Sequence, residues 1–342
     1  MIKTTIHDVA STAGVSIATV DRVLNNRPGV REATREKVHS AMRKLSYKPN
    51  TFAARLSKSK TYRFLFIVPS GRNSFMDKLR AEIGGAAEAA KAENIFIETR
   101  PIEAFNGVVL SKLLESLSPD EWDGVAVVVP DMPLVRQAID TCVRSGIKVV
   151  TLVSDLPSSM RSFYVGIDNI AAGRVAGRLL GRFTSGRKGK LAVIPGSLTL
   201  SDHMERFMGC GQVVRSHFPH LEMLPPVEGR DNAEDTEAVV GKLLRDHQNG
   251  VIAVYNAGAG NRGLIAALER CGRKTDIVVV AHELSPHSRK ALLDGTFDVI
   301  LSQNAEYEVE RAVTLLRQLC DGEKDIKNAF VRTDIFLPDN LY

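Results

Sequence analysis

The chain has 342 residues, of which 44% are hydrophobic and 25% charged, an ordinary balance for a folded protein with room for a small module and a larger two-lobed domain. Its four cysteines lie far apart without a CxxC pair, which favours reduced thiols in the cytoplasm. We expect neither export nor membrane insertion, because the first residues lack the apolar run of a signal peptide and no later segment holds about eighteen consecutive apolar residues.

The charge is unevenly distributed along the chain. Residues 1–60 hold 12 Lys and Arg against 4 Asp and Glu, whereas residues 61–342 hold 33 against 36. A basic head on a slightly acidic body indicates a polyanionic partner for the head alone. A solvated basic face is the alternative that charge by itself leaves open.

The head has the pattern of three short helices. Thr5 is expected to cap a helix over residues 6–13, and Ser16 to cap a second over residues 17–24, after a tight corner. A third helix is expected over residues 31–45, and apolar residues recur at helical spacing in all three. This is a helix-turn-helix pattern, in which the second helix enters the major groove of DNA.

The same segments carry a specific resemblance. The runs Ile6-His7-Asp8-Val9-Ala10, Ala13-Gly14-Val15-Ser16 and Arg22-Val23-Leu24-Asn25, with the later Ala54-Arg55-Leu56, closely resemble the head of the lac-repressor family. The resemblance implies a sequence-specific transcription regulator with a DNA-binding domain over 1–49, a hinge over 50–60, and an effector-binding and dimerisation domain over 61–342. The DNA contacts that it implies are Thr5, Ser16, Ile17, Ala18, Thr19, Arg22, Asn25, Asn50, Ala53, Leu56 and Lys58.

The second helix is where the resemblance places base recognition. Ile17, Ala18 and Arg22 occupy the positions that meet base edges, and Arg22 can donate two hydrogen bonds to a guanine. Ser16 and Thr19 are expected to cap the helix or to contact phosphates, which position the protein without specifying sequence. Ordinary helix surface is the alternative interpretation for Ile17 and Ala18.

The hinge is too short to be a stable helix by itself. The family resemblance implies that residues 50–60 fold on the operator and that Leu56 wedges into the minor groove. A flexible polar linker is the alternative, and it also describes the free state.

The body alternates apolar strands with helices such as 78–93 and 170–183, which predicts an α/β doubly wound fold with two lobes. The expected strands are 64–68, 124–129, 148–152, 190–194, 251–255, 276–280 and 299–301. The body resembles the effector domain of the same family, which shares its fold with periplasmic sugar-binding proteins. By that resemblance the first lobe comprises about 61–162 and 291–325, and the second about 163–290 and 326–342.

The resemblance also implies an effector cleft at the strand ends. Its expected residues are Asn73, Phe75, Asp155, Asp168, Arg206, Asn256, Glu283 and Gln303. Carboxylates, amides and an arginine suit paired hydroxyl groups, and a phenylalanine suits an apolar sugar face, so a sugar or polyol effector is expected. Each of these residues could instead be a solvated loop group or a helix cap.

Other functions have weaker support. Residues 258–263 satisfy G-x-G-x-x-G after a strand, with Glu283 about 20 residues on, as in dinucleotide-binding proteins, but such a fingerprint usually opens its domain. There is no G-x-S-x-G or HExxH sequence, and the histidines show no metal-ligand pattern, so neither an enzyme nor a cofactor or metal is expected. A transport binding protein would have a signal peptide and no basic head.

We therefore expect a cytoplasmic homodimer that reads a near-palindromic double-stranded operator and leaves it when the effector binds. A corepressor-dependent regulator and an activator are the alternatives within the family.

Overall fold

The structure is a computed structural model that describes residues 5–24, 29–45, 60–71 and 73–341. The chain divides into two compact units, Met1–Lys60 and Thr61–Tyr342. No helix of the described residues combines the length and apolar character needed to cross a membrane.

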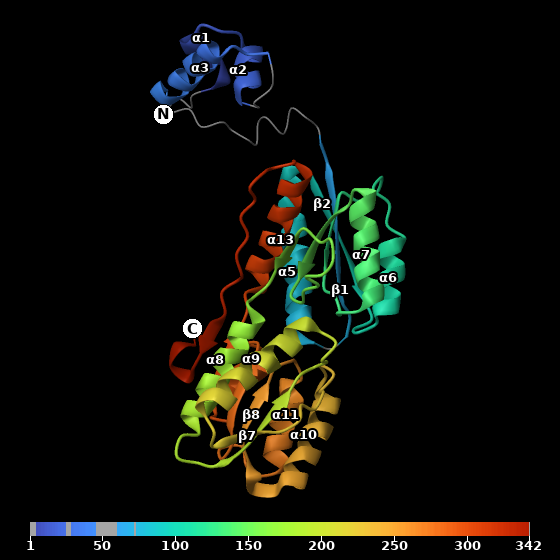
Figure 1. Ribbon diagram of the computed structural model, residues 1–342, viewed down its shortest axis with the longest axis vertical. Coiled ribbons are helices and arrows are strands. Elements are labelled where there is room, and N and C mark those ends of the chain that lie inside the picture. The colour runs from blue at the N-terminus through green and yellow to red at the C-terminus, as the bar shows by residue number, and fades with distance from the viewer. Residues whose placement is uncertain (1–4, 25–28, 46–59, 72, 342) are drawn as a thin grey trace. The chain divides into compact units, whose positions relative to one another are not determined.

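The first unit contains the three expected helices, α1 (Ile6–Ala13), α2 (Ile17–Leu24) and α3 (Glu32–Lys44) (Figure 1). Gly14 adopts φ +66° where α1 ends, a conformation that glycine adopts without steric cost, and so makes the corner between α1 and α2. The helices bury a small core of Val9, Ala10, Val20, Val23, Val38 and Ala41.

Both predicted caps are present. Thr5 precedes α1, and the Asp8 carboxylate accepts hydrogen bonds from the Thr5 backbone N–H at 2.7 Å and from its hydroxyl at 2.8 Å. The Ser16 hydroxyl accepts from the Thr19 backbone N–H at 3.1 Å. These bonds fix where α1 and α2 begin.

The first lobe of the second unit is a parallel five-stranded sheet with the order β2-β1-β3-β4-β5. Its strands are β1 (Tyr62–Pro69), β2 (Ile95–Ile102), β3 (Gly124–Val127), β4 (Lys148–Leu152) and β5 (Phe163–Val165). One face packs on α5 (Ser74–Ala90) and α13 (Ala305–Cys320), and the other on α6 (Gly107–Glu115) and α7 (Pro133–Ser145) (Figure 1). The near-continuous burial of β1 follows from this double cover.

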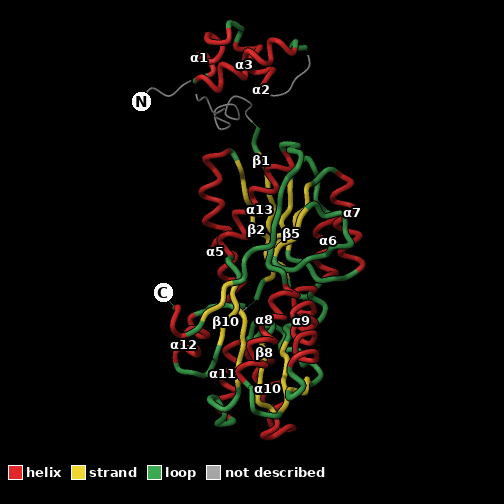
Figure 2. Tube along the Cα trace, turned by 60° about the vertical axis from the view of Figure 1, so that its left-hand side comes forward, coloured by secondary structure: helices red, strands yellow, loops and turns green. Residues whose placement is uncertain are grey.

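The second lobe is a six-stranded sheet with the order β11-β10-β9-β8-β6-β7, in which only β11 is antiparallel to its neighbour. Its strands are β6 (Gly189–Ile194), β7 (Leu221–Met223), β8 (Val251–Asn256), β9 (Val278–His282), β10 (Val299–Ser302) and β11 (Asp334–Phe336). Helices α8 (Asn169–Phe183) and α9 (Ser201–His217) cover one face, and α10 (Ala233–His247), α11 (Asn261–Arg270) and α12 (Pro286–Leu293) cover the other. Figure 2 shows the strands of each lobe between their layers of helices.

The chain crosses from one lobe to the other at different residues from those expected. β5 pairs with β4, so the first lobe continues to Val165, beyond the predicted boundary at 162. β10 pairs with β9, so residues 299–302 belong to the second lobe, not the first. Which strand β5 and β10 each pair with sets both boundaries, and the periodicity of a strand does not show its partner.

Candidate functional site

A cleft of about 1050 Å³, part of it open to solvent, lies between the two lobes of the second unit. The first lobe contributes the loops that follow β1, β2, β3 and β4, and the second contributes the loops that follow β8 and β9 and the start of α9. These are the carboxyl ends of parallel strands, where ligands bind in open α/β sheets.

Five of the eight residues predicted for the effector line this cleft, namely Asn73, Phe75, Arg206, Glu283 and Gln303. They come from both lobes and from the segment that crosses between them after β10. Asn73 has a second role, because its side-chain oxygen accepts from the backbone N–H of Phe75 at 3.0 Å and so starts α5 four residues before the predicted helix.

The other three predicted residues do not line the cleft and have other partners. Asp155 accepts two hydrogen bonds from the Arg161 guanidinium, at 2.6 and 2.5 Å. Asp168 caps α8 by accepting from a backbone N–H of its first turn at 2.8 Å. Asn256 is fully buried and donates to the Asn261 side chain at 2.7 Å. We therefore leave these three out of the proposed effector contacts.

Arg206 is the buried cation of the cleft, with 3% of its surface exposed. Its Nε donates to the Asn169 side chain and its Nη1 to the Ala257 carbonyl, both at 2.9 Å, while its Nη2 lies 3.9 Å from the Asp202 carboxylate. Burial disfavours the charge, but the carboxylate of Asp202 and other acidic groups around the guanidinium outweigh it and raise the pKa of Arg206. The guanidinium therefore stays charged and fixed in orientation.

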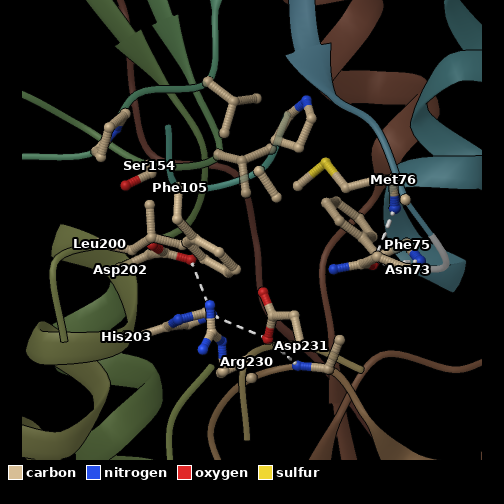
Figure 3. A pocket seen from close by; sticks show the side chains of 18 of the residues that line it. Asn73, Phe75, Met76, Phe105, Ser154, Leu200, Asp202, His203, Arg230 and Asp231 are labelled. Carbon is tan, nitrogen blue, oxygen red and sulfur yellow. Dashed lines mark hydrogen bonds and ion pairs between the residues drawn. The ribbon is translucent and has the colours of Figure 1, made fainter. Parts of the chain in front are cut away.

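Sequence reasoning missed an acidic cluster beside this arginine. His203 Nε2 lies 3.6 Å from Asp202 and 3.9 Å from Asp231, and Figure 3 shows the imidazole between the two carboxylates. His203 Nδ1 lies 3.1 Å from the backbone nitrogen of Ser197 and 3.2 Å from its carbonyl oxygen, so Ser197 holds the ring with Nε2 toward the carboxylates. One signal was available, because Asp202 precedes Arg206 by four residues and therefore shares its helix face.

Glu283 and Gln303 are joined across the cleft wall. Gln303 Nε2 donates to one oxygen of Glu283 at 3.0 Å, and the Ser302 hydroxyl donates to the other at 3.2 Å. Burial nevertheless raises the pKa of Glu283 to about 7. Its charge therefore changes near neutral pH.

The backbone of the cleft is held in unusual conformations. Positive φ angles occur at Phe105 (62°), Val153 (66°), Arg230 (50°), Asp231 (56°) and Glu283 (69°), and all five residues line the cleft. Such conformations cost free energy for residues other than glycine, most of all for β-branched valine, and they persist where the surrounding structure imposes them. Their concentration here indicates a built binding site.

The two lobes also touch at one edge of the cleft. The backbone N–H of Asp155 donates to the Ser201 hydroxyl at 2.9 Å, and this hydroxyl donates to the Asp155 carbonyl at 2.7 Å. Nearby, the N–H of Asp131 donates to the Thr199 carbonyl at 2.8 Å. These bonds hold the loops after β3 and β4 against the start of α9.

In the first unit, α2 presents a solvent-exposed face. Ile17 is 41% exposed although it is apolar, and Ala18 and Arg22 are also exposed. Their contact with bases stays a prediction. The predicted DNA contacts Asn25, Asn50, Ala53, Leu56 and Lys58 lie outside the described residues.

Each of the two units of the chain matches a known protein family. Residues 64–324 match the periplasmic binding protein domain, and residues 5–50 match the bacterial regulatory proteins of the lacI family. The chain belongs to the lacI family.

This lacI-family regulator has curated relatives among transcriptional regulators. It is 26% identical to the HTH-type transcriptional regulator DegA of Bacillus subtilis over 256 residues, 75% of this chain and 74% of DegA. It is 58% identical to the HTH-type transcriptional regulator GalR of Escherichia coli over 57 residues, 17% of each chain. Among solved structures, the glucose-galactose binding protein GanP of Geobacillus stearothermophilus is similar in fold, with a TM-score of 0.75 and 22% identity over 83% of this chain and 99% of GanP.

The glycine fingerprint of this lacI-family regulator has a packing explanation. A β-carbon at Gly263 would lie 2.0 Å from the Ala233 carbonyl oxygen, and one at Gly258 would lie 2.5 Å from the Gly196 backbone nitrogen. Gly260 has φ +90°. The glycines let the loop after β8 and the start of α11 approach neighbouring backbone, so they do not by themselves indicate a dinucleotide.

Glycines also bring α8 and α9 together. A β-carbon at Gly173 would lie 2.1 Å from the Arg206 carbonyl oxygen, and one at Gly209 would lie 2.2 Å from the Ile170 carbonyl oxygen. The two helices are thus in backbone contact. This packing sets the position of α9, which carries Asp202, His203 and Arg206 into the cleft.

Proposed function

We propose that this lacI-family protein is a cytoplasmic repressor that binds its operator as a homodimer, and that a sugar or another small polyol in the cleft releases it from DNA. The observation that carries the effector part is a set of buried polar atoms in the cleft that have no hydrogen-bond partner among the described residues. Asp202, Arg206 and Gln303 each have a buried polar atom of this kind. Buried polar groups are costly without partners, so a polar ligand is the natural complement.

Aromatic groups of the first lobe support a ring-shaped polyol. Phe75 and Phe105 line the cavity, and Figure 3 shows Phe75 across it from Asp202 and His203 of α9. Sugars present hydroxyls at their edges and apolar C–H groups on their faces, which suits a site with both kinds of wall. GanP, which shares the fold, is a glucose-galactose binding protein.

The exposed face of α2 supports the DNA-binding part. Ile17, Ala18 and Arg22 lie on the helix that a helix-turn-helix protein places in the major groove. A single module of this size makes few specific contacts, so we propose that two heads of a homodimer read the half-sites of a near-palindrome. Folding of residues 50–60 on DNA is the step that we propose the effector controls.

A two-stage experiment tests this proposal. A thermal-shift screen of the purified full chain against sugars, polyols, sugar phosphates and nucleotides identifies the effector, since a ligand at 100 times its Kd stabilises a protein by about 2.7 kcal/mol. Fluorescence anisotropy then measures binding to an operator selected in vitro, with and without the hit. Release by a sugar or polyol is the expected result.

The other outcomes identify the alternatives. Tighter DNA binding with the hit would make it a corepressor. Stabilisation by a dinucleotide alone would contradict the proposed effector class. Failure to select any preferred DNA sequence would contradict the regulatory role itself.

A further inference from the structure

The buried cleft atoms that lack partners among the described residues are two hydrogen-bond acceptors, one donor and one imidazole nitrogen. Asp202 Oδ1 and Gln303 Oε1 have no partner among the described residues, although their side chains are only 3% and 5% exposed. Arg206 Nη2 is the partnerless donor, and His282 Nδ1, on a ring whose Nε2 contacts the Tyr255 hydroxyl at 2.7 Å, is the fourth such atom of the lining. A ligand must therefore bring donors to Asp202 and Gln303 as well as an acceptor to Arg206.

The charge of the lining is also one-sided. Four carboxylates line the cleft, those of Glu103, Asp202, Asp231 and Glu283, against two arginines, Arg206 and Arg230.

Each arginine lies beside a carboxylate that offsets its charge. Arg206 already donates through Nε and Nη1, and its remaining nitrogen faces Asp202. Arg230 is exposed at the rim and lies 3.9 Å from Asp235. The side chains that line the cleft below its rim therefore carry more negative than positive charge. A site of low dielectric constant strengthens their repulsion of an anion.

We propose, on the basis of the function proposed above, that the effector is an uncharged polyol and that Asp202, Asp231 and Gln303 exclude the phosphorylated and carboxylated forms of the same compound. Hydroxyl groups donate and accept, so they satisfy all of the partnerless atoms. Ionised phosphate and carboxylate groups only accept, so they leave Asp202 Oδ1 and Gln303 Oε1 without partners and place a negative charge beside the carboxylates of Asp202 and Asp231.

Asp231 allows a test that preserves the fold. Its Oδ1 accepts from the backbone N–H of Ala259 at 2.7 Å, and its φ is +56°. Asparagine has the same shape, keeps an acceptor oxygen and tolerates this conformation, so Asp231→Asn removes the charge with little other change. Glu222→Gln on β7, exposed and outside the lining, is the matched control.

The experiment is isothermal titration of the full chain at pH 7.5 with matched sets of probes. Each set contains a neutral sugar, its phosphate ester and its acid, such as glucose, glucose 6-phosphate and glucuronate, with galactose, arabinose and myo-inositol starting further sets. We expect the neutral member of the set that binds to exceed its anionic derivatives at least a hundredfold in affinity. Asp231→Asn should reduce that ratio at least fivefold, and Glu222→Gln should leave it unchanged.

Two results would overturn the inference while leaving the proposed function intact. One is an anionic derivative that binds as tightly as its neutral parent. The other is a ratio that Asp231→Asn leaves unchanged. Binding by none of the neutral or anionic probes, together with stabilisation by a different class of compound, would instead overturn the proposed effector class and with it this inference.

Discussion

The Ser201 hydroxyl bridges the two lobes by accepting from the backbone N–H of Asp155 and donating to its carbonyl, at 2.9 and 2.7 Å. Because the two residues belong to different lobes, the bridge stabilises only arrangements in which this edge of the cleft is closed. Ser201→Ala should lower effector affinity about threefold to tenfold, chiefly through faster dissociation, since each hydrogen bond contributes about 0.5–1.5 kcal/mol. Stopped-flow dissociation of the effector measures this.

The control for this bridge is Ser116→Ala, because the Ser116 hydroxyl donates to the Leu113 carbonyl of its own helix end and has no other partner among the described residues. An effector dissociation rate that is the same in Ser201→Ala and Ser116→Ala would show that the bridge does not contribute to closure.

Variants at Arg206 should distinguish its contribution to effector binding from its contribution to the stability of the body. Arg206→Ala leaves the buried Asp202 carboxylate without its cation and should destabilise the body by about 3–5 kcal/mol as well as abolish effector binding. The double variant Arg206→Met with Asp202→Asn removes both charges and should recover much of the stability but none of the binding. Urea denaturation followed by fluorescence of Trp122, the one tryptophan, which is buried in the first lobe, reports on the body.

The double variant is the decisive arm of that comparison. Recovery of effector binding in Arg206→Met with Asp202→Asn would show that neither charged group contacts the ligand.

Glu283 should make stability depend on pH. Burial raises its pKa in the folded protein to about 7, above the ordinary value of 4.5. Between about pH 4.5 and pH 7 the folded protein keeps a proton on Glu283 that the unfolded chain has lost. The contribution of this group to the free energy of unfolding is therefore complete below about pH 4.5 and is lost as pH rises to about 7. Glu283→Gln should raise the stability at pH 8 by about 1–2 kcal/mol and leave it unchanged near pH 4.5.

Urea midpoints at pH 4.5, 6 and 8 measure the effect of Glu283. The neighbouring donor Gln303 can bond to glutamine as well as to glutamate, so loss of that bond does not confound the result. A constant difference between the wild type and Glu283→Gln across this range would contradict the assignment.

Arg22 should control base preference. Arg22→Ala should lower the discrimination between the operator and single-base variants by about 10-fold to 100-fold, the equivalent of about 1–3 kcal/mol. Lys58→Ala, by contrast, should weaken binding to all sequences alike and reduce the dependence on salt. Anisotropy at two salt concentrations separates the two effects, and intact selectivity in Arg22→Ala would contradict its role.

The periodicity of apolar residues predicts the bounds of those helices and strands that are long enough to show a period. The helices of the head and strands such as β4 and β6 have the expected bounds within a residue or two, because their apolar residues recur with the period of the element. β2 was not predicted, since Thr99, Arg100 and Pro101 interrupt its apolar pattern. Strands β5, β7 and β11 have three residues each, too few to show a period.

The cleft was predicted less completely than the fold. Arg206, Glu283 and Gln303 follow from their places after strands, whereas His203 and Asp231 enter the cleft only because the start of α9 and the loop before α10 meet in space. Asp155 and Asp168 are the residue type expected for sugar hydroxyls, but an arginine six residues away and a helix start occupy their carboxylates. Local sequence does not show that competition.

The backbone contact of α8 with α9 limits how this protein can change its ligand over evolution. A side chain at Gly173 or Gly209 would separate the helices and move Asp202, His203 and Arg206 together. A variant with a larger residue at either position would therefore displace all three cleft side chains at once. New ligand specificities must therefore arise by substitution of cleft side chains while the backbone of α9 keeps its position. Divergence in this lineage should therefore change the identity of residues 202, 203 and 206 and leave their positions unchanged.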